Sequence, residues 1–304
     1  MPLERSILFL VNPHAGRSEI RGKLLEVIQI FSEGGFEVTV RPTLYPGEIP
    51  KILRRSAGRF DIVVCCGGDG TLNETLNGLM PLSVRPPLGY LPGGTVNDFA
   101  ASLGIPRSPT EAAQTIVRGD SCRIDVGRFA ERYFSYIAAF GAFTEVSYQT
   151  PQQSKLLLGR TAYILEGIKR LPELKAYPMR VEGDGFSCEG DFLFGMVSNS
   201  SSVGGFRLGD RQRVSMTDGL LEVTLVRNPQ NVSQLTAVIN SILRQDFDSE
   251  FVHSFKSAHA RFVSPNAVPW TLDGEFGGSP SEVSVSVASR AIRVFCPKTE
   301  HISV

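Results

Sequence analysis

A glycine-rich segment with a single acidic side chain carries the strongest chemical signal in the sequence. It reads Gly67-Gly68-Asp69-Gly70-Thr71-Leu72-Asn73 and lies between a buried-strand pattern and a helical pattern. Glycines let the main chain approach a ligand closely, and free N–H groups at a helix start attract phosphate. Asp69 fits this setting if a magnesium ion lies between its carboxylate and the phosphates. A tight turn with a capping aspartate is the alternative reading. An ordinary P-loop is excluded, because its Gly-x-x-x-x-Gly-Lys-Ser/Thr pattern is absent.

Two further turns have the same character. Asn12-Pro13-His14-Ala15-Gly16 follows the first strand pattern, and Pro92-Gly93-Gly94-Thr95-Val96-Asn97-Asp98 follows a short one. The carboxyl ends of parallel strands lie along one edge of a sheet, and ligands bind in the crevice at that edge. Three such turns at one edge are explained more simply by one nucleotide site than by three unrelated turns.

A pair of carboxylates near the end of the chain is the second chemical candidate. Asp273 and Glu275 flank Gly274, directly after the apolar stretch Trp270-Thr271-Leu272. A carboxylate beside apolar groups can have a raised pKa and act as a general base. Asp-Gly is also a common hairpin signal, and the residues alone favour a plain turn. Both interpretations can hold, because a turn at a domain cleft can carry catalysis.

The first 125 residues alternate strand and helix patterns and so predict a Rossmann-like, doubly wound nucleotide-binding domain. The expected strands are 7–11, 36–40, 61–66 and 88–91, and the expected helices are 21–31, 49–55, one through 72–79, 98–103 and 109–117. Continuous apolar strands such as 61–66 are typical of a parallel sheet that is covered on both faces. The three glycine turns follow three of these strands.

Short strand patterns dominate after about Arg123 and predict an antiparallel β-sandwich domain over residues 126–289. The expected strands are 123–127, 133–139, 179–182, 192–198, 220–226, 260–263 and 283–287, with helices near 152–171 and 232–244. The apolar segment 291–295 can pair with either domain, so 290–304 is a candidate last strand of the first domain. We expect the active site in the cleft between the two domains.

Composition limits the classes of partner. Lys+Arg and Asp+Glu both number 31 among 304 residues, so no overall basic charge directs the chain to nucleic acid or to an anionic membrane. The five cysteines show no metal-ligand spacing, and the N-terminus does not resemble a signal peptide, which favours a cytoplasmic protein. No run reaches the roughly 20 apolar residues of a membrane span. The helix at 152–171 has basic and apolar sides that suit either membrane contact or core packing.

Three motifs in this order resemble the diacylglycerol kinase catalytic domain. They are Asn12-Pro13-x-x-Gly16, the Gly67–Thr71 turn and Gly94-Thr95-Val96-Asn97-Asp98-Phe99-Ala100. The soluble bacterial lipid kinases, related to sphingosine and ceramide kinases, are the most similar branch. The second half continues the resemblance at Gly159–Tyr163, Gly204–Phe206, Asp218–Val223 and Leu272–Glu275.

The resemblance implies an ATP- and magnesium-dependent kinase that phosphorylates a lipid alcohol. The ATP site would be lined by Asn12, Pro13, His14, Ala15, Gly16, Thr43, Gly67, Gly68, Asp69, Gly70, Thr71, Leu72, Asn73 and Thr95. Asp69 would act near the catalytic magnesium. Asp273 or Glu275 would accept the hydroxyl proton, and the apolar neighbours of Asp273 favour that residue.

A second, structural magnesium is implied at Asp218, with the main-chain carbonyls of Ser215 and Leu220 completing the site. The family often has Pro-x-Ala before its Asp-Gly pair, where this chain has Gln212 and Val214. Carbonyl ligation does not depend on the side chain, so the departure bears on the shape of the loop.

Two other functions are compatible with parts of the sequence. An NAD kinase shares the Gly-Gly-Asp-Gly-Thr turn, but the 94–100 segment favours a lipid kinase. A catalytically silent ATP-binding regulator would lack Asp69 or both Asp273 and Glu275, and all three are present. The expected partners are a lipid substrate and, transiently, a membrane surface. Diacylglycerol, phosphatidylglycerol and sphingoid acceptors are all open, and so is a homodimer.

Overall fold

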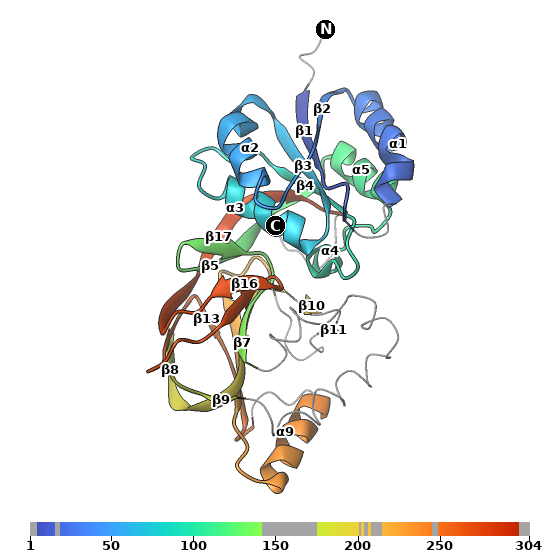
Figure 1. The fold of residues 1–304 in the computed structure, drawn as a ribbon. Helices are drawn as coiled ribbons and strands as arrows, with labels where there is room; N and C mark the ends of the chain where they lie inside the picture. Colours follow the sequence, from blue (N-terminus) through green and yellow to red (C-terminus); the bar gives the residue numbers. More distant parts are fainter. Residues whose placement is uncertain are drawn as a thin grey trace.

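Two stacked domains share a continuous sheet in the computed structural model (Figure 1). The structure describes residues 5–15, 19–141, 175–200, 202–203, 206–207, 215–244 and 249–297. The expected helix at 152–171 and the Gly159–Tyr163 motif lie outside these residues, as do Gly16, Gly204, Gly205, Gln212 and Val214.

The first domain is built on a parallel sheet with the strand order β4-β3-β1-β2. Its strands are β1 (Arg5–Val11), β2 (Phe36–Pro42), β3 (Ile62–Gly67) and β4 (Leu88–Pro92). All residues of β3 and β4 are buried, as a sheet covered on both faces requires.

Helices cover both faces of this sheet, which confirms the expected fold class. Helix α1 (Glu19–Glu33) packs with α5 (Pro109–Arg118) on one side, and α2 (Ile49–Ser56) packs with α3 (Asp69–Leu79) on the other (Figure 1). A 3-10 turn at Ala57–Arg59 and the short α4 (Asp98–Ser102) complete the helices described in this domain.

The second domain is antiparallel, as expected. Its strands are β6 (Arg132–Phe134), β7 (Ile137–Gly141), β8 (Tyr177–Gly183), β9 (Phe186–Ser198), β12 (Leu221–Arg227), β13 (Val252–Ser257), β14 (His259–Val263), β15 (Trp270–Leu272) and β16 (Glu275–Gly278), with a small hairpin of β10 (Ser202–Val203) and β11 (Phe206–Arg207). Helix α9 spans Val232–Arg244. The core centres on Trp270, which is 1% exposed and packs 4.8 Å from the Phe140 ring and 5.0 Å from the Phe262 ring.

Two long strands, β5 (Ser121–Phe129) and β17 (Glu282–Phe295), pass between the domains. Strand β17 pairs with β14 in the sandwich and, at Val294 opposite Leu88, with β4 of the parallel sheet. The sequence suggested separate segments at 283–287 and 291–295. Both ranges are strand, but the division between them was wrong, because a bulge between Ala288 and Ile292 inserts extra residues without ending the strand.

No described helix is long and apolar enough to cross a membrane.

Candidate active site

Two glycine turns lie in direct contact where β3 and β4 end. The Gly93 N–H donates to the Gly67 carbonyl oxygen at 2.7 Å. A Cβ atom on Gly94 would lie 2.7 Å from the Gly68 Cα, closer than real Cβ contacts allow. Glycine is therefore needed for the main chains to approach this closely. Asn97 closes the second turn in a left-handed conformation (φ 56°), with its Oδ1 accepting the Gly94 N–H at 2.9 Å.

The turn after β1 joins this pair at the same edge of the sheet. The Asn12 N–H donates to the Cys66 carbonyl at 2.9 Å, and Asn12 Nδ2 donates to Thr71 Oγ1 at 2.9 Å. Asn12 Oδ1 accepts the His14 N–H at 3.0 Å, which holds the turn. The buried Thr43 follows β2 and donates its N–H to the Val11 carbonyl at 2.8 Å. The predicted nucleotide-site residues that the structure describes thus gather at one edge.

Asp69 begins α3 and has one oxygen without a partner. Its Oδ2 accepts the Asn97 N–H at 3.0 Å, while the buried Oδ1 has no hydrogen bond within the described part of the chain. Burial, with smaller effects of the Asp98 and Asp273 charges, raises the pKa of Asp69 to about 7. A buried, unpartnered carboxylate oxygen among other acids fits a bound Mg²⁺, which takes oxygen ligands and favours the ionised form.

Asp273 lies in the β15–β16 turn and is 4% exposed, with φ 50°. Its Oδ2 accepts from Ser135 N (2.7 Å), Ser135 Oγ (2.8 Å) and Asn73 Nδ2 (2.7 Å). Its Oδ1 accepts the N–H groups of Tyr136 at 3.0 Å and Ile137 at 3.1 Å. Burial raises the pKa of Asp273, and the donors oppose that rise. With five donors on its two oxygens, this carboxylate joins the turn to both domains.

These bonds also explain an error in the strand prediction. The sequence indicated one strand over 133–139, but the structure has β6 and β7 with a break at Ser135 and Tyr136. The main-chain N–H groups of the break bind Asp273 in place of a strand partner. An apolar, aromatic run does not reveal such a break, because its cause lies 138 residues away.

Glu275 is placed differently although it lies only two residues from Asp273. The turn at Gly274 (φ 87°) separates the two side chains, and Glu275 is exposed. Its Oε1 lies 3.6 Å from the position that a Cβ on Gly70 would occupy, directly over the phosphate-type turn. No hydrogen bond or ion pair of its carboxylate is recorded among the described residues. Of the two candidate bases, Glu275 is the one with free acceptor oxygens.

Two residues of this site were not assigned roles from the sequence. Asp98 is 1% exposed, and its charge raises the pKa of Asp69. The buried Tyr136 has a pKa raised well above its usual value by burial and then by the charges of four carboxylates, Asp273, Asp69, Asp98 and Glu275. Asp98 belongs to the 94–100 motif and could have been singled out as an acid in a phosphate turn. Tyr136 has no motif around it.

Asp218 lies at a separate place, beside the sandwich strands β12 and β13. Its Oδ1 accepts the Leu220 N–H at 3.1 Å and its Oδ2 accepts from Lys256 Nζ at 3.0 Å. Lys256 Nζ also lies 3.1 Å from Glu222 Oε1. Burial raises the pKa of Glu222 to about 7. Because the Lys256 ammonium contacts both carboxylates, it would compete with a metal ion for Asp218 Oδ2. The described residues include no group of three or more His, Cys, Asp or Glu arranged for a metal.

The loop that carries Asp218 is held by a fully buried carboxylate. Asp125 Oδ2 accepts the Gly219 N–H at 2.7 Å, and the Asp125 N–H donates to the Met216 carbonyl at 2.7 Å. Ser215 precedes this contact, and its Oγ lies 3.1 Å from Thr217 Oγ1. Asp125 thus orders the loop predicted to hold a structural metal ion, through the main-chain groups of Met216 and Gly219.

Comparison with known proteins covers both domains. Residues 6–129 match the diacylglycerol kinase catalytic domain, and residues 138–296 match the YegS C-terminal NAD kinase beta sandwich-like domain. The chain is 34% identical over 293 residues to the diacylglycerol kinase of Bacillus subtilis (95% of each chain) and 31% identical over 292 residues to that of Staphylococcus aureus MRSA252 (95% of this chain, 91% of the relative).

Two solved structures of Bacillus anthracis proteins share the fold. One, with 24% sequence identity, superposes with a TM-score of 0.82 over 98% of each chain. The other, described as a diacylglycerol kinase and 21% identical, has a TM-score of 0.77 over the whole of both chains. Both superpositions cover the parallel sheet and the β-sandwich together.

Proposed function

Because the chain belongs to the diacylglycerol kinase catalytic domain family and is an ATP-dependent lipid kinase, we propose that it transfers the γ-phosphoryl group of ATP to the hydroxyl of a lipid alcohol. A diacylglycerol, the substrate class in the names of its curated relatives, is the first candidate acceptor. Phosphatidylglycerol and sphingoid acceptors present the same reacting group, a hydroxyl on an amphiphile.

The observation that carries this proposal is that the candidate phosphate-binding groups and the candidate base lie at one place. The glycine turns and Asp69 come from the first domain, and Glu275 comes from the second and lies over Gly70. Phosphoryl transfer needs mainly positioning and charge stabilisation, with a group to receive the acceptor's proton. Each of these tasks has a residue suited to it at this edge of the sheet.

We assign the phosphates to the turn formed by residues 67–73, at the start of α3. Free N–H groups at a helix start favour anions, and the close Gly68–Gly94 approach leaves no side chain in the way. Asp69, with its unpartnered Oδ1, would hold a magnesium ion, which when bound neutralises charge on the phosphates.

We assign the base role to Glu275 and a positioning role to Asp273. The lipid oxygen attacks the γ-phosphorus, the bond to the ADP oxygen breaks, and the hydroxyl proton passes to the Glu275 carboxylate. Asp273 cannot take that proton without losing donors, because both of its oxygens are already bonded. This reverses the order of preference that the sequence suggested for the two residues.

The second magnesium site expected at Asp218, with the carbonyls of Ser215 and Leu220, stays a prediction. The single carboxylate and two carbonyls suit Mg²⁺, whereas the Lys256 contact at 3.0 Å competes for the same oxygen. We also propose transient contact with a membrane surface, because the acceptor resides there. A cytoplasmic location and a homodimer remain expectations from the sequence.

Transfer of labelled phosphate from ATP to a panel of acceptors tests the function. The panel contains diacylglycerol, phosphatidylglycerol and sphingosine in mixed micelles, and NAD in solution. We expect a labelled lipid and no labelled NADP. Rapid labelling of NAD without any labelled lipid would favour the NAD kinase alternative instead.

A further inference from the structure

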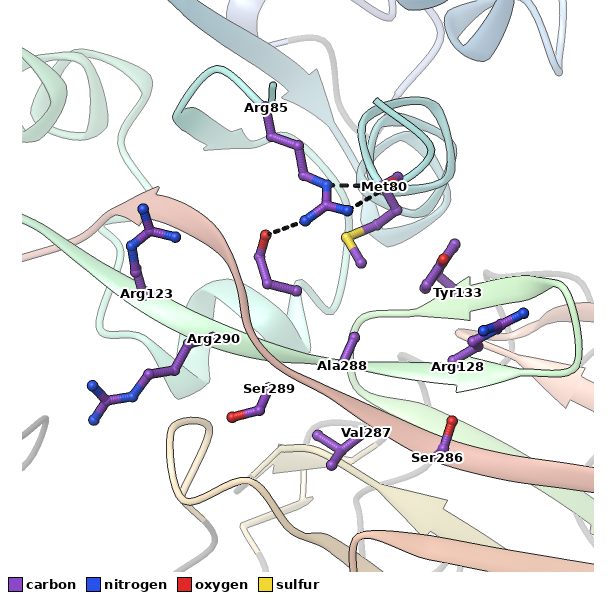
Figure 2. Close-up of a pocket in the computed structure, with 11 residues that line it drawn as sticks. Met80, Arg85, Arg123, Arg128, Tyr133, Ser286, Val287, Ala288, Ser289 and Arg290 are labelled. Carbon is purple, nitrogen blue, oxygen red and sulfur yellow. Dashed lines mark hydrogen bonds between the residues drawn. The ribbon is translucent and has the colours of Figure 1, made fainter. Parts of the chain in front are cut away.

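A polar pocket of about 370 Å³ lies where the two domains join, within the range of roughly 300–1,000 Å³ typical of small-ligand sites. It is lined by the end of α3, the loop that follows it, and strands β5 and β17 (Figure 2). Four arginines contribute to its wall, with two serines: Arg85, Arg123, Arg128, Arg290, Ser286 and Ser289. We call this feature the arginine pocket.

Three of the four arginines in the arginine pocket have no ion pair among the described residues. None of its described lining residues is Asp or Glu. Arg128 is the one arginine of the four with an ion pair among the described residues, because its guanidinium lies 3.0 Å from Glu131 Oε1. Within the described part of the chain, Arg85 donates to uncharged carbonyls, those of Met80 (2.8 and 3.1 Å) and Ala291 (3.0 Å). Arg123 and Arg290 have no ion pair recorded within the described part of the chain.

The main chain of β17 beside the pocket is held by the buried carboxylate of Asp125. Arg290 lies in the β17 bulge with φ 46°, and its N–H donates to Asp125 Oδ1 at 2.7 Å. Asp125 thus contacts the main chain of Arg290, and its other oxygen accepts the Gly219 N–H. Arg123 lies opposite Arg293 in the β5–β17 pair, and like charges directly opposite each other destabilise a sheet. A bound anion would offset this repulsion.

The arginines of the pocket lie toward the opposite end of α3 from the phosphate turn, and Tyr133 connects the two places, because it lines the pocket and its carbonyl accepts from Asn73 Nδ2 at 3.1 Å. Asp69 begins α3, whereas Met80 follows the end of that helix, 11 residues or about 16 Å away, and Arg85 lies in the loop beyond it. Arg85 also precedes β4, and the phosphate turns follow the opposite ends of the strands. The phosphates assigned to the start of α3 therefore lie at the other end of this helix from Met80.

We propose that the arginine pocket binds a phosphate-bearing anion, such as inorganic phosphate or the phosphomonoester of a small molecule or lipid. Planar guanidinium groups present paired donors that match phosphate oxygens, and the serine hydroxyls add further donors. Such a ligand would be held by guanidinium groups from the loop after α3 and from strands β5 and β17.

Calorimetric titration of the full chain tests this proposal. Inorganic phosphate and glycerol 3-phosphate are titrated at constant ionic strength, with saturating ADP and magnesium to fill the nucleotide site. The test variant is Arg123→Gln/Arg290→Gln, and the matched control is Arg59→Gln/Arg118→Gln, which removes two exposed arginines elsewhere in the first domain. We expect the control to bind like the parent protein and the test variant to bind at least about tenfold more weakly.

A vesicle arm separates a soluble ligand from a lipid one. Sedimentation compares phosphatidylcholine vesicles with and without phosphatidic acid, using the same three proteins. Loss of soluble-anion binding in the test variant assigns a small phosphate ligand. Loss of binding to phosphatidic acid vesicles alone assigns a lipid headgroup. The proposal is overturned if the parent protein binds neither form, or if the test variant binds both as the parent does. Circular dichroism checks that each variant is folded.

Discussion

The carboxylate of Asp273 in the second domain accepts a 2.7 Å hydrogen bond from the side-chain amide of Asn73 in the first. Asn73 is the fifth residue of α3, the helix that begins with Asp69, and Asp273 begins the turn that carries Glu275. This contact therefore fixes Asp69, the candidate metal ligand, relative to Glu275, the candidate base. A second bond from Asn73 Nδ2 to the Tyr133 carbonyl, at 3.1 Å, reinforces the same connection.

Asp273→Asn should destabilise the fold as well as reduce activity. An amide group can replace only one carboxylate oxygen as acceptor, so its NH₂ would face donors such as Tyr136 N–H and Ile137 N–H. We expect the free energy of unfolding to fall by about 3 kcal/mol, measured by urea denaturation. Asp191→Asn, an exposed change on β9, is the control. Unchanged stability with a large loss of turnover would instead make Asp273 the base.

Glu275→Gln should lower the rate of phosphoryl transfer and leave the stability of the fold unchanged. Its carboxylate is exposed, so the amide should leave the free energy of unfolding nearly unchanged. General-base catalysis contributes roughly 10²–10⁴-fold, so kcat should fall by about that factor at saturating lipid. The affinity for ATP, measured by calorimetry, should stay within about twofold of the parent value. Glu37→Gln, another exposed carboxylate, provides the control. A parental kcat in the Glu275 variant would refute the assignment.

Asp69 should make stability depend on pH when divalent ions are removed. Burial disfavours the charged form and raises its pKa from the usual value of 3.8 to about 7 in the folded state. Between these values the folded chain holds a proton that the unfolded chain has lost, so stability falls as pH rises from about 4 to 7. Denaturation at pH 5 and pH 8 in chelator measures this fall.

Asp69→Asn should be less sensitive to the same pH change, because an amide does not titrate. Turnover should be lost while the circular dichroism spectrum is retained, since the side chain lies at the tip of a helix. An identical pH profile in the variant and the parent protein would argue against the raised pKa. Full activity would argue against a magnesium ion at this carboxylate.

Local pattern predicted much of the fold and of the nucleotide side of the site. The apolar runs that became β1, β3 and β4 are buried on both faces, and the glycine turns follow them directly. Such features depend on residues adjacent in the chain. Helix α9, with its apolar periodicity, was likewise expected at 232–244 and is observed at Val232–Arg244.

The division of labour between Asp273 and Glu275 could not be derived in this way. It depends on Ser135 and Tyr136 leaving the sheet to offer N–H groups, and on Gly274 turning the chain between the two carboxylates. The β17 bulge could not be predicted from local sequence either, because Asp125 and Arg85 bind its main chain from distant elements. Long-range contacts that satisfy main-chain groups have no local signature.

Gly94→Ala should impair nucleotide binding, and Gly22→Ala should not. A Cβ on Gly94 would lie 2.7 Å from both the Gly68 Cα and the Asn97 Oδ1. The first neighbour is main chain and cannot move aside, so the two glycine turns would separate. We therefore expect the dissociation constant of ATP, measured by calorimetry with magnesium, to rise at least about tenfold, the equivalent of one lost charge-assisted hydrogen bond. Gly22 lies in α1 with open space around its Cβ position, and alanine there should stabilise the helix by about 0.5–1 kcal/mol. Equal ATP affinity in the two variants would mean that the close approach of the turns does not shape the phosphate site.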